Sequence, residues 1–187
     1  MTSSQRTEPF VATTGQGAGD PRIYVACLAA YNNGHLHGRW VSAAQDEDHI
    51  WSETHAMLAD SPESDAEEWL IHEYENFEGA VLSGYASFAS VCKLGQFIAE
   101  HGRLGAKLYS HYGNDLEQAC AAFSDYAGEF QNLGDFAEYL TEQTGPELPS
   151  AFQYYIDWQA MGRDMELNGD VFTIKTGYDQ LHVFWQR

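Results

Sequence analysis

The sequence predicts an α+β fold, because segments patterned like strands lie near both ends of the chain and segments patterned like helices lie between them. Its 187 residues are 44% hydrophobic, enough to bury a sizeable core as one domain or as a few small ones. We expect a flexible tail over 1–21, an α+β sub-domain over 22–78, a helical sub-domain over 79–123 and an α+β sub-domain over 124–187.

The first sub-domain is expected to open with an antiparallel hairpin. Two apolar, aromatic-rich runs between residues 22 and 41 flank Asn32-Asn33-Gly34, and Asn-Gly readily adopts the positive φ angles of a tight turn. A short helix over 49–58 should follow and stop at Ser61-Pro62. The segment 67–79 (EEWLIHEYENFEG) lacks a one-sided helical pattern, so we expect a strand there.

The central sub-domain is expected to be helical. Apolar side chains recur over 80–101 at intervals of three and four residues and end at Gly102, which predicts two short helices in this region. The residues of this pattern are Tyr85, Phe88, Val91, Cys92, Gly95 and Ile98. Asn114 can cap a further helix. Its expected apolar face consists of Leu116, Ala119, Cys120 and Phe123.

The C-terminal sub-domain alternates strands and helices. The segment 124–130 predicts a short strand, and 135–145 predicts a helix capped by Asp135 and closed by Gly145-Pro146. After Pro149 an apolar stripe predicts one amphipathic helix that ends near Asn168-Gly169. The stripe is formed by Tyr154, Trp158, Met161 and Met165. The runs VFTIK and LHVFW then predict a second hairpin.

The strongest compositional signal is acidity, with 28 Asp and Glu against 9 Lys and Arg and a formal net charge of -19. Such a chain repels nucleic acid and anionic membranes, so we expect neither as a partner and expect a basic protein instead. Three widely spaced cysteines form no metal-binding or disulfide pattern, and no apolar run resembles a signal peptide or a membrane span. We therefore expect a cytoplasmic protein.

The acids are arranged in two blocks. The segment 41–92 contains 12 acids and the segment 108–162 contains nine, and neither contains a Lys or Arg; Lys93, Arg103 and Lys107 form a positive island between them. We expect the partner to bind the carboxylates of Asp46, Glu47, Asp48, Glu53, Asp60, Glu63, Asp65, Glu67, Glu68, Glu73, Glu75, Glu78, Asp115, Glu117, Asp125, Glu129, Asp135, Glu138 and Glu142.

Helical spacing can align such carboxylates like phosphates. Asp135, Glu138 and Glu142 share one predicted helix face, and Asp157 and Asp164 share another. Residues four apart rise about 6 Å along a helix, close to two steps of about 3.4 Å along one DNA strand. Each like-charged i, i+4 pair destabilises a helix by about 0.2–0.5 kcal/mol, which a partner's Arg and Lys could offset.

Other functions remain open at this level. A solvated helix face or adaptation to high salt also produces acidic chains, although such adaptation should spread the acids more evenly. The basic target could be a CRISPR effector, a nucleoid protein or a repressor, and a small acidic hydrolase is a further alternative.

The sequence offers little to catalysis or metal binding. His35 and His37 could share one side of a strand, with third ligands from His49, His55 or His72-Glu73, but no zinc signature supports a site. No nucleophile, phosphate-binding or dinucleotide motif is present, so we expect no enzyme, no metal and no cofactor. We expect Arg39 and Arg163 to stabilise the fold through salt bridges.

Several segments together resemble the ArdA antirestriction family. They are Tyr24-Val25, Tyr31 to Gly34, Gly38 to Trp40, Tyr126 to Phe130, Phe136-Ala137, Tyr155 to Trp158, Gly162 to Asp164, Asn168 to Asp170 and His182 to Phe184. The resemblance covers about 22–184 and leaves out the N-terminal tail.

The resemblance implies an elongated acidic homodimer of small α+β sub-domains in a row, with its dimer contact in the C-terminal sub-domain. It also implies a DNA mimic that occupies the DNA channel of type I restriction-modification enzymes, at their methyltransferase core. The family's antirestriction motif falls approximately on Asp125 to Leu140.

Overall fold

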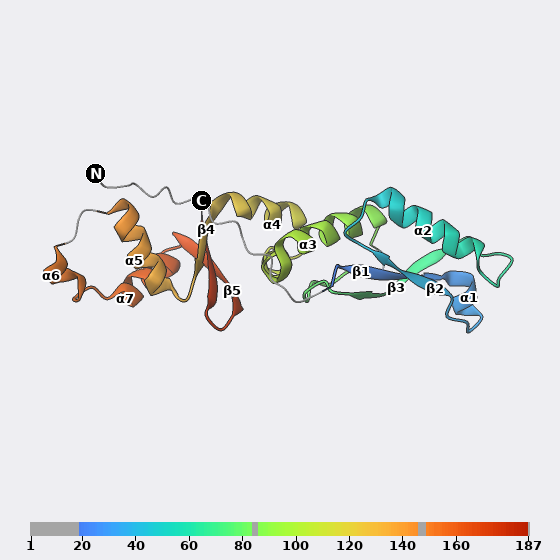
Figure 1. The fold of residues 1–187 in the computed structure, drawn as a ribbon, viewed down its shortest axis with the longest axis horizontal. Helices are drawn as coiled ribbons and strands as arrows, with labels where there is room; N and C mark the ends of the chain where they lie inside the picture. The colour runs from blue at the N-terminus through green and yellow to red at the C-terminus, as the bar shows by residue number, and fades with distance from the viewer. Residues whose placement is uncertain (1–18, 84–85, 146–148, 187) are drawn as a thin grey trace, which may run out of the picture.

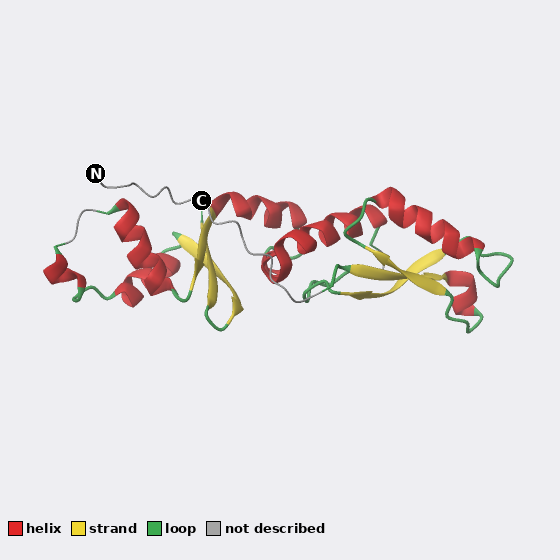
Figure 2. Cartoon of the chain, viewed as in Figure 1, coloured by secondary structure: helices red, strands yellow, loops and turns green. Residues whose placement is uncertain are grey.

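The computed structural model describes residues 19–83, 86–145 and 149–186 and shows an elongated α+β chain (Figure 1). Two three-stranded antiparallel sheets lie apart along the long axis, and helices lie between and beside them (Figure 2). The α+β class expected from the sequence is confirmed. Of the tail expected over 1–21, residues 1–18 lie outside the described residues.

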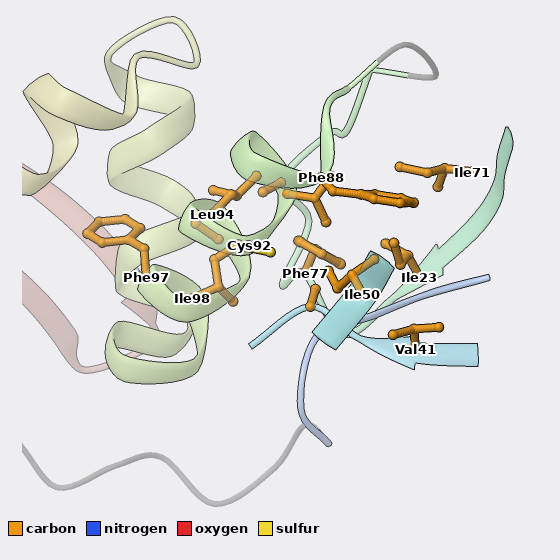
Figure 3. Close-up of a cluster of buried hydrophobic side chains, with 14 of the residues drawn as sticks. Ile23, Val41, Ile50, Ile71, Phe77, Phe88, Cys92, Leu94, Phe97 and Ile98 are labelled. Atoms are coloured by element: carbon orange, nitrogen blue, oxygen red, sulfur yellow. The ribbon is translucent and has the colours of Figure 1, made fainter. Parts of the chain in front are cut away.

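The first sheet has the strand order β2-β1-β3, formed by β1 (Arg22–Cys27), β2 (Gly38–Ser42) and β3 (Trp69–Glu75). Helix α2 (Glu47–Ala59) covers one face. Figure 3 shows Ile23 and Val41 of the sheet gathered with Ile50 of α2, and all three side chains are buried. Burial of these apolar side chains holds the helix on the sheet.

The expected tight turn between the first two strands is wrong. Helix α1 (Leu28–Asn32) continues directly from β1, with the Cys27 Sγ accepting from the Ala30 backbone N–H at 3.5 Å. The run Leu-Ala-Ala favours a helix. Asn33 and Gly34 end this helix instead of forming the hairpin turn, and only Gly34 has a positive φ, of 82°.

The predicted helix over 49–58 and the predicted strand within 67–79 are confirmed as α2 and β3. The helix begins earlier than expected because Asp46 accepts the His49 backbone N–H at 2.8 Å and caps it.

The centre contains α3 (Phe88–His111), capped by Ser87 and kinked at Gly102, where φ is 54°. Gly102 ends the first half of α3, as the sequence predicts. That half begins only at Phe88 rather than near residue 80, and the second half, over 103–111, lies beyond the expected stretch. Tyr85 lies outside the described residues. Helix α4 (Leu116–Ala122) follows, and Asp115 caps it where Asn114 was expected to. Cys120 was placed on its apolar face but is exposed.

The second sheet has the strand order β4-β6-β5. A 3-10 turn, η1 (Phe123–Asp125), precedes β4 (Tyr126–Phe130), and β5 (Val171–Gly177) forms the predicted C-terminal hairpin with β6 (Gln180–Trp185).

Helix α5 (Leu133–Thr144) follows β4, and its cap is Asn132 rather than the expected Asp135. The Asn132 Oδ1 accepts the Asp135 backbone N–H at 3.0 Å, which places Asp135 in the first turn. Gly145 closes the helix as expected, and Pro146 lies outside the described residues.

The helix expected after Pro149 ends at Leu167 and Asn168 as predicted, but its expected continuity from Pro149 is wrong. The chain forms α6 (Ser150–Gln153) and, after a break, α7 (Trp158–Leu167). Asp157 starts α7 by accepting the Ala160 backbone N–H at 2.9 Å, and the Tyr154 side chain is 92% exposed rather than part of an apolar stripe. Local capping therefore overrides the apolar spacing at this point.

The apolar core connects the parts of the chain. The larger cluster runs from the first sheet through α3 and α4 to Ile174 and Phe184 of the second sheet, and a smaller cluster holds Phe136, Val171 and Val183. The Arg103 guanidinium donates to the Thr176 carbonyl at 3.1 Å. Helix α3 is therefore attached to both ends of the molecule.

All three cysteines carry free thiols. None of the helices in the described part of the chain is long and apolar enough to cross a membrane.

Candidate partner-binding surface

Helix α2 begins and ends in acids. Besides the cap Asp46, its first turn carries Glu47 and Asp48, where carboxylates are favoured by the helix dipole. The Glu47 Oε1 accepts from the Trp51 indole N–H at 3.1 Å, whereas Asp48 is exposed and makes no side-chain contact in the described structure. The N-terminal end of α2 thus presents three carboxylates.

Arg39 neutralises the other end of α2. Its guanidinium lies 2.9 Å from Glu53 and 3.5 Å from Asp60, so β2 and α2 are joined by an ion-pair group as the sequence predicts. Arg163 does not act in the same way, since the described structure pairs it only with the adjacent Asp164, at 3.9 Å. A pair between neighbouring residues on one helix cannot join two elements.

Five further predicted acids contact other side chains of the same chain. Each contact fixes one carboxylate at the surface: Glu63 accepts from Asn33 at 2.9 Å, Glu75 pairs with Arg22 at 2.6 Å, Glu78 lies 3.7 Å from Arg103, Glu129 lies 4.0 Å from His182, and Asp135 accepts from Asn132 at 3.0 Å. The sequence alone did not separate these acids from unengaged ones.

Two of the predicted acids are involved in pKa shifts, Asp115 through its own carboxylate and Asp125 through its effect on a neighbour. The Gln118 backbone and side-chain N–H groups lower the pKa of Asp115 by hydrogen bonding to its carboxylate. Asp125, at the end of η1, adds to the effect of burial in raising the pKa of Tyr112. Asp115 therefore stays charged while it caps α4.

A second group of predicted acids is exposed and has no side-chain partner among the described residues. It extends from α2 to α5 and consists of Asp48, Asp65, Glu67, Glu68, Glu73, Glu117, Glu138 and Glu142. These unpaired carboxylates, as we call them below, remain free to meet cations from outside.

Two acids on helix α5 destabilise it. Glu138 and Glu142 are exposed at i, i+4, and Glu142 lies in a last turn that has no basic residue. Like charges at this spacing and an acid at the negative end of the helix dipole both destabilise a helix. The arrangement stabilises nothing within the described chain.

The acidic surroundings also act on a buried thiol. Burial, together with the charges of Glu47 and Asp46, raises the pKa of Cys92. A thiol with a raised pKa is a poor nucleophile, so Cys92 packs as an apolar side chain.

Three polar side chains join the strands of the second sheet. Two of them, Tyr126 and His182, belong to the segments that resemble the family, but no sequence pattern predicted their contact. The Tyr126 hydroxyl and His182 Nδ1 are 2.9 Å apart, and His182 Nε2 is 2.9 Å from the Thr176 hydroxyl. Burial and the nearby Glu129 raise the pKa of Tyr126 to about 12, while burial lowers the pKa of His182. Both groups are thus held neutral and support β4, which opens the segment Asp125 to Leu140.

The histidines considered as metal ligands are not brought together in the described structure. His37 Nε2 lies 2.8 Å from the Met57 carbonyl, His35 faces Glu63 at 3.5 Å, His55 stacks on Trp51, and His72 contacts Tyr24 and Tyr31. Within the described residues no group of three His, Cys, Asp or Glu side chains could hold a metal ion.

The chain matches a known protein family over most of its length. A protein-family model described as "Antirestriction protein (ArdA)" matches residues 23–180. No curated protein matches the chain. The family match covers all the unpaired carboxylates, the first sheet except Arg22, and the second sheet as far as the first residue of β6.

Proposed function

Because the chain belongs to the ArdA family of antirestriction proteins, we propose that it imitates duplex DNA and occupies the DNA-binding channel of a type I restriction-modification enzyme. Membership makes it a non-enzymatic inhibitor directed at restriction-modification, so the hydrolase alternative is abandoned. The proposal concerns how it inhibits and which class of enzyme it meets.

The observation that carries this proposal is the set of exposed, unpaired carboxylates on elements from α2 to α5 of an elongated molecule (Figure 1). Within the described chain, the ion pairs of Arg22, Arg39 and Arg103 engage acids next to the sheets, while acids on α4, on α5 and around β3 lack a cation. A basic channel supplies the Lys and Arg that these acids lack, because it is built to bind phosphates.

The spacing on α5 supports the same interpretation. Glu138 and Glu142 rise about 6 Å apart on the helix, which is close to two steps of about 3.4 Å along one DNA strand. Cations spaced to bind alternate phosphates of one strand can therefore pair with Glu138 and Glu142.

We also propose that the protein acts as a homodimer through its C-terminal part. Phe152, Tyr154 and Tyr155 surround the break between α6 and α7, with side chains 61%, 92% and 84% exposed. Large aromatic side chains this exposed are typical of protein interfaces. A second copy would bury them, and sedimentation of Tyr154→Ser/Tyr155→Ser should then show a monomer where the wild type is a dimer.

Competition with DNA tests the proposed mechanism. The purified protein is titrated into a type I methyltransferase core bound to labelled duplex, at low and at moderate salt. Stoichiometric release of the duplex that weakens as salt rises supports mimicry, since salt screens charge pairing. Failure to displace duplex at either salt concentration contradicts it and points to a different basic target.

The affinity should be distributed over many carboxylates. Replacing one unpaired carboxylate by its amide, as in Glu117→Gln, should weaken displacement only slightly, whereas combined replacements should weaken it strongly. A single replacement that abolishes displacement while the fold and the oligomeric state are unchanged would count against a distributed charge surface.

A further inference from the structure

One face of the first sheet is left uncovered in the described structure. Ile23 and Val25 point toward α2 and are buried, so the alternation of a strand directs Arg22 and Tyr24 to the opposite face. Figure 1 shows α2 on one side of this sheet and no described helix packed across the other. This uncovered side is called the open face below.

The open face already binds one guanidinium group, which comes from the chain itself. The Arg22 Cζ lies 4.7 Å from the centre of the Trp40 ring, and its Nη2 lies 2.6 Å from the Glu75 carboxylate. A ring beneath the guanidinium and a carboxylate at its edge are both attractive to arginine. The surface is therefore suited to arginine side chains.

A second set of the same groups lies beside the first. The His72 ring is 6.2 Å from Tyr24 and 5.3 Å from Tyr31, whose side chain is 46% exposed. Glu73 is directly opposite Tyr24 in the pairing of β1 with β3, so the two side chains lie on the same face. In contrast to Glu75, Glu73 has no ion-pair partner in the described part of the chain.

We propose that Tyr24, Tyr31, His72 and Glu73, together called the arginine cradle, receive an arginine side chain of the restriction-modification enzyme. The inference rests on the proposed function, because that function supplies a basic partner. Arginine suits the cradle better than lysine, since its flat, weakly hydrated guanidinium stacks on rings while it pairs with a carboxylate. The rings would present the π-face that a base offers, and Glu73 would replace a phosphate.

The preference for arginine can be measured without the enzyme. Calorimetry with hexa-arginine and hexa-lysine peptides compares wild type with Tyr31→Leu, Tyr31→Phe and Glu73→Gln. We expect Tyr31→Leu and Glu73→Gln to lower the hexa-arginine affinity by about two- to fivefold and the hexa-lysine affinity by less. Tyr31→Phe keeps the ring and should bind like wild type.

Matched controls distinguish the effect of the cradle from the effect of losing any one charge or any one exposed ring. Glu68→Gln removes an unpaired carboxylate from the same acidic block, and Tyr178→Leu removes an exposed ring from the β5–β6 turn. Glu68→Gln should weaken both peptides equally, and Tyr178→Leu should change neither. The cradle proposal is refuted if Tyr31→Leu lowers the affinity for both peptides equally, or for neither.

The enzyme assay distinguishes failure of the cradle from failure of mimicry. If wild type displaces duplex from the methyltransferase core but Tyr31→Leu and Glu73→Gln match their controls, the cradle is wrong and the proposed function stands. If wild type displaces no duplex, the proposed function fails whatever the peptides show. If Tyr31→Leu instead turns a dimer into a monomer, a second copy occupies the face and the assignment to the enzyme is refuted.

Discussion

Replacing Glu138 and Glu142 by Gln should stabilise the protein and weaken its inhibition at the same time. The two carboxylates are exposed one turn apart on α5, so neutralising them removes a repulsion of about 0.2–0.5 kcal/mol. Glu142 also opposes the helix dipole in the last turn, an effect of about 0.3–1 kcal/mol. Gln and Glu have similar helix propensities, so the free energy of unfolding should rise by about 0.5–1.5 kcal/mol.

The same change removes two charges from the surface proposed to face the enzyme. An exposed ion pair contributes about 0.2–1 kcal/mol, so the loss of two should weaken displacement of duplex between about twofold and thirtyfold. Urea denaturation measures the first effect, and competition on the methyltransferase core measures the second.

A control with equal charge is available outside the two acidic blocks. Asp170→Asn/Asp179→Asn removes two exposed acids from the ends of the C-terminal hairpin. The reasoning is refuted if Glu138→Gln/Glu142→Gln loses stability, or if it inhibits no worse than this control.

Three further changes test the fold and its pH dependence. Burial holds the pKa of His182 below its ordinary value of about 6.5, so the unfolded chain binds more protons between those two pKa values and stability should fall as pH drops below about 6.5. His182→Gln should flatten that slope in thermal melts between pH 7.5 and 5.5 without abolishing it, because burial also lowers the pKa of His101. Gly162→Ala would press a Cβ against the Leu133 carbonyl oxygen. Overpacking between α7 and α5 should therefore exceed the gain in helix propensity and cost about 1–2 kcal/mol in urea denaturation. Asp46→Ala should lower the free energy of unfolding by about 1 kcal/mol because it removes the cap of α2, whereas Asp46→Asn retains the cap. Both changes remove the charge, so equal inhibition by the two folded variants would show that the charge of Asp46, and not its cap, matters for inhibition.

The sequence predicted the strands well because the residue patterns that indicate them are local. The pattern of β3 and the two runs of the C-terminal hairpin needed no knowledge of their partners. The prediction of a tight turn failed because Leu28 to Asn32 also has the composition of a helix. Strands β1 and β2 can pair with either a tight turn or a short helix between them. The break at Asp157 failed because an apolar stripe does not show where a cap interrupts it.

The predicted helix caps were wrong where two suitable capping residues lie close together. Asn132 and Asp135 are three apart, and either could accept a backbone N–H; the structure uses the earlier one, as the Asn132–Asp135 contact shows. Asn114 and Asp115 are adjacent, and the positive φ of Asn114, 70°, leaves Asp115 to cap α4. Local sequence narrows the start of a helix to a few residues and does not choose among them.

The acidic blocks indicated a surface but not which acids are engaged within it. Glu75 is fixed by Arg22, which lies 53 residues away in sequence, and Glu53 on α2 is fixed by Arg39 on β2. Such pairs depend on sheet order and register, which periodicity does not provide. Glu73, two residues from Glu75, differs from it only in what the fold places opposite.

Salt separates a DNA mimic from a chain that is acidic only to remain hydrated. Both kinds of chain gain stability as salt screens repulsion among 28 acids and 9 basic residues. In a mimic the unpaired carboxylates are also the binding groups, so the same screening must weaken its hold on a basic partner. Glu142, unfavourable where it lies on α5, would then be stabilised only in the complex. Opposite effects of salt on stability and on affinity therefore follow from one set of charges, and hydration alone accounts for only the first.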